Sequence, residues 1–229
     1  MRGLPHHQPA MNHTHHDPAP ASHDTSAINS TRQDFSGLDS VWLFGYGSLI
    51  YKVDFPYIER RPATIRGWSR RLWQGSHDHR GTFEHPGRVA TLVPERDATC
   101  LGMGYRVTPA VFEHLDHREK NGYLRFAMTL HFADGESAEG IVYIANEENA
   151  AWLGPADEAA IARHVAGASG PSGSNREYVL RLAETLRELG ADDPHVFGVE
   201  ARLRKCVLPA SARPWIDVLP AGFRWGRRR

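Results

Sequence analysis

The clearest pattern in the chain is a short, continuous apolar run at Val41–Phe44, which is typical of a strand buried on both faces. The run ends at Gly45, and a second glycine follows at Gly47. Glycines so close together predict a tight turn. The chain is therefore expected to leave a buried strand and present bare backbone directly after it.

A second pattern is the alternation of apolar and polar side chains in Tyr123–Phe132, which predicts a strand with one buried face. Asp134 and Gly135 follow it as a hairpin-turn signal. Further strands are predicted at residues 66–73, 89–93, 102–107 and 140–145, and helices at residues 109–118, 157–165, 174–189 and 195–207. Because the strands outnumber what one hairpin needs and are joined by turns as well as helices, we expect an α+β fold. Its sheet should be small, mixed and barrel-like, closed or nearly closed, with flanking helices.

The two ends of the chain differ from its middle. Residues 1–38 are rich in Pro and polar residues, have hardly an aliphatic side chain to bury, and contain the histidines His6, His7, His13, His15, His16 and His23. We expect a disordered N-terminal extension there, one domain at residues 39–208, and an irregular C-terminal tail at residues 209–229. Metal capture by these histidines is an alternative, although their irregular spacing prepares no site.

The composition of the chain argues against several classes of function. Lys and Arg together number 27, as do Asp and Glu, so the formal net charge is zero and we expect neither nucleic acid nor an anionic membrane as a partner. The two cysteines, Cys100 and Cys206, form no Cys-x-x-Cys motif, so neither a disulfide framework nor a zinc ribbon is indicated. With no apolar run of about 18 residues and no signal-peptide core, we expect a cytoplasmic protein.

The turn after the first strand is a candidate binding site for an anion. Glycines remove side chains that would block close approach, so consecutive backbone N–H groups can surround a carboxylate or a phosphate. The candidate residues are Tyr46, Gly47, Ser48, Leu49 and Ile50. Ile50 stands where a dinucleotide fingerprint requires its third glycine, no Gly-Lys-Ser/Thr ending makes a P-loop, and Ser48 lacks the frame of a nucleophile elbow. A tight strand-to-helix turn without a ligand is the alternative interpretation.

Six blocks of the sequence, taken in order, resemble a known family. They are Phe44-Gly45-Tyr46-Gly47-Ser48-Leu49-Ile50, Arg70-Arg71-Leu72-Trp73-Gln74-Gly75-Ser76, His79-Arg80-Gly81-Thr82, Pro86-Gly87-Arg88, Arg118-Glu119-Lys120-Asn121-Gly122-Tyr123, and residues 170–178. Together they resemble the ChaC-type γ-glutamylcyclotransferases over about residues 41–190, most closely the glutathione-specific ChaC2-like branch. The resemblance implies conversion of glutathione to 5-oxoproline and cysteinylglycine, a lyase-type intramolecular acyl transfer, with no metal or nucleotide cofactor.

Glu119 is the candidate catalytic residue. It is predicted at the C-terminal end of a short helix, where the negative end of the helix dipole raises a carboxylate's proton affinity and so suits a general base. From the residues alone, an exposed glutamate paired with Arg118 or Lys120 is the alternative. The resemblance favours catalysis, because the family's catalytic glutamate lies in this block. Asn121 departs from the glycine usual in the closest branch, and little harm is expected because Asn tolerates a left-handed backbone.

Three further features border the predicted site. Tyr178 falls on the apolar stripe of a helix and is by that pattern a core residue, whereas the resemblance implies that it borders the substrate. Arg71 is a candidate for binding the glycine carboxylate of glutathione, with a salt bridge or a surface position as equal alternatives. His77-Asp78-His79 is interpreted as a loop beside the substrate pocket, with a metal site as the alternative.

The predicted chemistry is attack of the γ-glutamyl α-amine on the side-chain carbonyl, with the turn amides holding the α-carboxylate and Glu119 carrying the proton. One alternative is a cyclotransferase that acts on other γ-glutamyl amino acids or amines. A second is a non-catalytic γ-glutamyl-ligand-binding module of the same fold, which the presence of Glu119 disfavours. A third is a structural or regulatory protein that uses its histidine-rich end to bind a metal or a partner.

Overall fold

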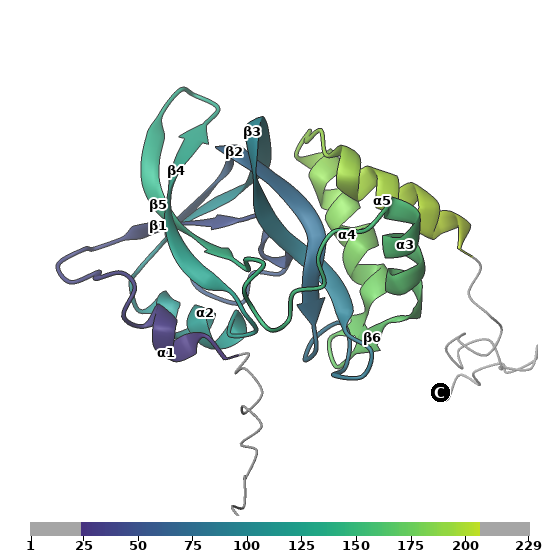
Figure 1. The fold of residues 1–229 in the computed structure, drawn as a ribbon. Coiled ribbons are helices and arrows are strands. Elements are labelled where there is room, and N and C mark those ends of the chain that lie inside the picture. The colour runs from purple at the N-terminus through teal and green to yellow at the C-terminus, as the bar shows by residue number, and fades with distance from the viewer. Residues whose placement is uncertain (1–23, 207–229) are drawn as a thin grey trace, which may run out of the picture.

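The computed structural model describes residues 24–206 of the chain. Its centre is a closed barrel of five strands: β1 (Val41–Gly45), β2 (Glu59–Ser76), β3 (Gly87–Val107), β4 (Leu124–Phe132) and β5 (Ser137–Ile144). They follow one another around the barrel in the order β1-β3-β2-β4-β5. The barrel closes where β1 pairs in parallel with β5, whereas its other pairs are antiparallel (Figure 1). The predicted α+β fold with a mixed, barrel-like sheet is confirmed.

The long hairpin of β2 and β3 corrects the strand count expected from the sequence. The segments predicted as separate strands at residues 89–93 and 102–107 belong to one strand, β3. The pairing shifts between Arg66 and Trp68, so that Glu95–Ala98 have no partners in β2. These four residues include Asp97 in the left-handed region, with a φ of 65°. A β-bulge of polar residues therefore resembles a loop in the sequence.

Three helices cover one side of the barrel, over β2 and β3 (Figure 1). They are α3 (Glu158–Gly167), α4 (Asn175–Glu188) and α5 (Pro194–Lys205). Their apolar faces meet the barrel in one core cluster that includes Leu182, Leu186 and Leu72, all fully buried. Ser174 caps α4 by accepting a hydrogen bond from the Glu177 amide, as its capping-box sequence predicts.

The short helices lie at the lower end of the barrel in Figure 1 or at the turn after β1. They are α1 (Ser26–Asn29), the 3₁₀ helix η1 (Ser48–Ile50) and α2 (Val111–Arg118), and a two-stranded ribbon of β6 (Ser169–Gly170) and β7 (Gly173–Ser174) precedes α4. The α2 helix begins two residues later than predicted. No side chain caps it, and Thr108 instead accepts a hydrogen bond from Val111 through its carbonyl.

The N-terminal boundary differs from the expected one at residue 38. Residues 24–38 are placed against the barrel and include α1, with Asn29 fully buried. The expectation of disorder is therefore wrong for this part of the extension. The histidine-rich part at residues 1–23 and the predicted tail at residues 209–229 lie outside the described residues. Within residues 24–206, no helix is long and apolar enough to cross a membrane.

Candidate active site

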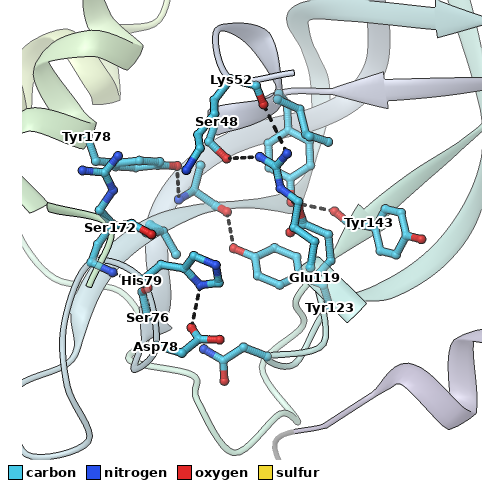
Figure 2. Close-up of a pocket in the computed structure, with 18 of the residues that line it drawn as sticks. Ser48, Lys52, Ser76, Asp78, His79, Glu119, Tyr123, Tyr143, Ser172 and Tyr178 are labelled. Carbon is cyan, nitrogen blue, oxygen red and sulfur yellow. Dashed lines mark hydrogen bonds and ion pairs between the residues drawn. The ribbon is translucent and has the colours of Figure 1, made fainter. Parts of the chain in front are cut away.

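A cavity of about 150 Å³ opens at one end of the barrel, where segments distant in the sequence meet. The turn after β1, the last residues of β2, the start of β3, the end of α2, the β6–β7 turn and the first turn of α4 all line it. Figure 2 shows Ser48 and Lys52 on one side and Ser76, Asp78 and His79 on the other. The candidate residues Tyr46, Gly47, Ser48, Leu49, Glu119 and Tyr178 all line this cavity.

Both glycines of the turn lie where a side chain would have little space. Gly45 and Gly47 are absent from the glycines with positive φ, and Gly47 has a φ of −117°. A Cβ atom at Gly45 would lie 2.8 Å from the Cβ atom of Leu49. At Gly47 it would lie 3.3 Å from the hydroxyl oxygen of Tyr178 and 3.6 Å from the Cβ atom of Ala90. Both positions therefore keep side chains out of a narrow space.

Gly47 is also the N-cap of η1, and this places the first amides of a short helix at the cavity. The first N–H groups of a helix have no partner within it. Ser48 lines the cavity as well, and its hydroxyl accepts a hydrogen bond from Arg118 at 3.1 Å. The Ile50 side chain points into the core and does not line the cavity. Its amide donates to the carbonyl of Gly47 at 3.1 Å, so the predicted cradle lacks its last N–H group.

Glu119 is the C-cap residue of α2, as the sequence predicted. Its side chain is only 17% exposed, and its Oε1 lies 3.2 Å from the Nε of Arg118. The predicted pairing with Arg118 is thus present, but the glutamate is not a surface residue. Burial raises the pKa of Glu119, and the charges of Arg118 and His79 oppose that rise. The carboxylate is therefore held in a place that favours proton uptake.

Three tyrosines form the inner wall by bonding to the backbone. Tyr178 accepts a hydrogen bond from the amide of Ala90 at 3.0 Å, and Tyr123 donates to the carbonyl of the same residue at 2.7 Å. Tyr46 donates to the carbonyl of Tyr143 at 2.7 Å. Burial raises the pKa of Tyr178 to about 12, so its hydroxyl stays neutral near pH 7. Tyr178 is both a core residue and a lining residue, and the two interpretations hold together.

The opposite wall is polar and comes from the end of β2, the loop between β2 and β3, and the β6–β7 turn. Asp78 accepts a hydrogen bond from the Nδ1 of His79 at 2.8 Å, and both residues line the cavity with Ser76 and Ser172. The loop therefore borders the cavity, as interpreted from the sequence. Within residues 24–206, no three His, Cys, Asp or Glu side chains gather where they could hold a metal ion.

Arg71 does not reach the cavity, and its predicted role in binding the substrate is corrected here. It pairs with Glu95 at 2.6 Å on another part of the surface. Its neighbour Arg70 is buried and donates from Nε to the carbonyl of Tyr46 at 2.6 Å, which supports the turn from behind. Successive residues of a strand point to opposite faces, so the inward position of Arg70 turns Arg71 outward.

Two arginines line the cavity although they were not predicted as site residues. Arg118, which the sequence offered only as a partner of Glu119, bonds to Ser48, Glu119 and Asp54 together. Arg80 from the β2–β3 loop reaches the carbonyl of Ser174 at 3.1 Å. Both belong to the resembling blocks, which is the sequence signal that could have placed them at the site.

The comparisons with known proteins agree with the fold. The family model described as ChaC-like protein matches residues 41–206. A Danio rerio protein named glutathione-specific gamma-glutamylcyclotransferase 1 is 42% identical over 185 residues, which are 76% of this chain and 94% of that protein. An Arabidopsis thaliana protein named gamma-glutamylcyclotransferase 2-3 is 40% identical over 194 residues, or 80% of this chain and 97% of that protein.

A solved structure gives the same result. The crystal structure of a selenomethionine-labelled γ-glutamyl cyclotransferase specific to glutathione from yeast superposes with a TM-score of 0.69 at 30% sequence identity. The match covers 73% of this chain and 96% of the yeast chain.

Proposed function

The chain belongs to the ChaC-like protein family, and we propose that it is a glutathione-specific γ-glutamylcyclotransferase. It converts glutathione into 5-oxoproline and cysteinylglycine. The names of the Danio rerio relative and of the yeast structure support glutathione as the substrate. The single observation that carries the proposal is the position of Glu119, a sheltered carboxylate next to the amides of the Gly47–Leu49 turn in one cavity.

The reaction needs a folded substrate and a proton carrier. The α-amine of the glutamyl group attacks its own γ-carbonyl carbon, a five-membered lactam forms, and the bond to the cysteine nitrogen breaks. Holding the glutamyl chain in a folded conformation replaces a conformational search and contributes several kcal/mol. The first amides of η1 bind the α-carboxylate, and this places the neighbouring α-ammonium group beside Glu119.

Glu119 then works in both directions. Its carboxylate takes a proton from the α-ammonium group, which frees the amine for attack, and it returns a proton to the departing cysteine nitrogen. The raised pKa of Glu119 brings its proton affinity closer to what each transfer needs. Arg118 contacts both Glu119 and Ser48, and so fixes the position of the base relative to the turn.

The leaving part of the substrate lies toward the polar wall of the cavity. Cysteinylglycine carries a peptide group and a carboxylate, and both require hydrogen-bond partners. Ser76, His79 and Ser172 offer such groups on the side of the cavity away from Ser48 (Figure 2). A smaller leaving group such as alanine would leave part of this wall without a partner, which costs affinity for the transition state.

The test is direct incubation of the purified full chain with glutathione, followed by measurement of 5-oxoproline and cysteinylglycine. We expect both products in equal amounts. We also expect kcat/KM for glutathione to exceed that for γ-glutamylalanine by at least about tenfold, which is about 1.4 kcal/mol. Absence of 5-oxoproline would contradict the proposed reaction, and equal kcat/KM values would contradict only the specificity for glutathione.

A further inference from the structure

The segment Asp24–Gln33 precedes the region that the family model matches, yet it packs onto the loop that follows Glu119. The α1 helix within it contacts α2 and β4, and Figure 1 shows α1 beside α2 at the lower end of the barrel. The loop consists of Lys120–Tyr123 and joins α2 to β4. The conformation of this loop therefore affects where the side chain of Glu119, the C-cap residue of α2, points.

Thr25 donates two hydrogen bonds to this loop, one from its amide and one from its hydroxyl, which has two carbonyls within reach. Its amide donates to the carbonyl of Lys120 at 2.9 Å, and its hydroxyl lies within hydrogen-bonding distance of the same carbonyl at 3.0 Å. The hydroxyl also lies 2.7 Å from the carbonyl of Tyr123. Buried backbone carbonyls need hydrogen-bond donors, and Thr25 supplies donors to this loop in addition to the Gly122 amide, which bonds to the carbonyl of Lys120 at 2.9 Å. Thr25 itself is 9% exposed, and water competes little for these bonds.

Asn29 extends the contact to the helix. Its side chain donates to the carbonyl of Tyr123 at 2.9 Å and accepts from the amide of Arg125 at 2.9 Å. Arg125 pairs with Asp116 at 2.9 Å, and both side chains are less than 10% exposed. Asp116 lies one turn before Glu119 on α2 and also accepts from the hydroxyl of Tyr143 at 2.6 Å. The segment thus contacts both the loop after Glu119 and, through Arg125, the helix before it.

We propose that Thr25 and Asn29 are positioning residues for Glu119: they fix the Lys120–Tyr123 loop so that the carboxylate faces the Gly47–Leu49 turn. The proposal rests on the proposed function, because it takes Glu119 to be the base. It assigns a role in catalysis to a segment outside the matched family region. Small displacements of a catalytic group cost rate even when the substrate still binds.

A merely structural role for the segment is the competing explanation, since Phe35, which follows it, packs on Phe112 of α2 with ring centroids 4.5 Å apart. Three variants separate the two. Thr25→Val keeps the shape and removes the hydroxyl, and Thr25→Ser keeps the hydroxyl. Thr31→Val is the matched control, because the Thr31 hydroxyl bonds only locally, to the carbonyl of Ile28 at 3.0 Å.

We expect Thr25→Val to lower kcat for glutathione by about 3- to 10-fold, or about 0.7 to 1.4 kcal/mol, with KM changed by less than about twofold. Thr25→Ser and Thr31→Val should stay within about twofold of the unaltered enzyme in both constants. A normal kcat for Thr25→Val, or a low kcat that Thr25→Ser shares, would overturn the proposal.

Hydrogen exchange gives a second measurement that does not depend on activity. In the unaltered protein, the amide of Thr25 should be protected to an extent similar to the barrel strands, and Thr25→Val, unlike Thr31→Val, should speed exchange at Lys120–Tyr123. If Thr25→Val does not fold, the protection of Thr25 in the unaltered protein decides the matter. Exchange at the rate of an unstructured peptide would overturn the proposal. If the unaltered protein does not convert glutathione, the proposed function fails, and the exchange data still report on the contact.

Discussion

Glu119 experiences two opposing effects on its ionisation. Burial disfavours its charged form, whereas Arg118 at 3.2 Å and His79 favour it, and the net effect is a raised pKa. A raised pKa in the folded state means that protonation stabilises the fold. At a pH above this pKa the ionised carboxylate therefore costs stability that a neutral side chain of the same shape would not.

The first prediction is that Glu119→Gln removes activity without harming the fold. Glutamine keeps the shape but has no basic lone pair, and loss of a general base typically lowers kcat by about 100- to 10,000-fold. Its melting temperature at neutral pH should equal or exceed that of the unaltered protein, for the reason just given. Both quantities come from a 5-oxoproline assay and a thermal melt. A variant that keeps more than a tenth of the normal rate would remove Glu119 from the role of base.

The second prediction concerns the turn. Gly47→Val should damage binding of glutathione more than Ser48→Ala, because a branched side chain would enter the narrow space below the Tyr178 hydroxyl. Alanine at position 48 deletes one hydroxyl, whose bond to Arg118 is worth about 0.5 to 1.5 kcal/mol. Measured kcat/KM values for both variants check this order.

A substrate analogue tests the same turn in the unaltered enzyme. Glutathione with an amidated glutamyl α-carboxylate lacks the charge that the amides of Gly47–Leu49 are proposed to bind, so it should react poorly. If it reacts as well as glutathione, the turn is structural and the α-carboxylate is held elsewhere.

At the scale of elements, a buried ion pair joins the helical side of the molecule to the active-site turn. Arg70 of β2 pairs with Asp193, the N-cap residue of α5, and their side chains are 1% and 10% exposed. The same guanidinium donates to the carbonyl of Tyr46, the residue that follows β1. The Arg70 side chain therefore links the α5 helix and the barrel to the turn after β1.

The third prediction is that Arg70→Met destabilises the protein by about 3 to 5 kcal/mol, because it leaves the buried Asp193 carboxylate without its partner. Arg61→Met is the matched control. Arg61 also lies on β2, but its partners Asp134 and Glu136 are 52% and 67% exposed, so its loss should cost about 1 kcal/mol or less. Urea denaturation gives both free energies of unfolding. Equal losses of unfolding free energy in the two variants would show that the buried Arg70–Asp193 pair does not stabilise the packing of α5 on the barrel.

Apolar periodicity predicted those elements that are held by apolar burial. It located β1 and β4 and the three helices α3, α4 and α5, because their buried side chains recur at fixed spacing. It divided β3 in two, because the bulge at Glu95–Ala98 is polar. It missed the segment around Thr25 and Asn29 for a related reason: hydrogen bonds to the loop hold these two residues, and they leave no apolar pattern.

The site could be predicted from the sequence only for those residues that belong to short recognisable motifs. Glu119 and Gly47 stand in blocks whose order is specific, and the structure brings them to one cavity. Arg70 and Arg71 show the limit of such inference. Because successive side chains of a strand alternate between its faces, Arg70 and Arg71 must point in opposite directions. Which of them is buried depends on the packing of α5 on the barrel, and the sequence alone does not give this.

At the scale of the whole molecule, barrel closure brings the cavity's walls together. The parallel pairing of β1 with β5 places the turn after β1 beside Tyr143 of β5, and the Tyr46 hydroxyl bonds to the carbonyl of that residue. The helical layer adds Tyr178, and the β6–β7 turn adds Ser172. The active site thus depends on contacts between residues more than 90 positions apart in the chain.

The last prediction is that prolonged treatment with EDTA leaves kcat/KM for glutathione unchanged and that no nucleotide is needed. The cyclisation requires geometry and a proton carrier, and in the proposed mechanism Glu119 transfers the proton without a Lewis acid. The two candidates considered from the sequence are the loop that contains Asp78 and His79, which bond to each other, and the histidines of residues 1–23. Inactivation by EDTA, with recovery on addition of zinc or manganese, would contradict the prediction. His79→Asn would then test the cavity: if it abolishes the recovery, the metal binds there, and if it does not, the metal binds elsewhere in the chain.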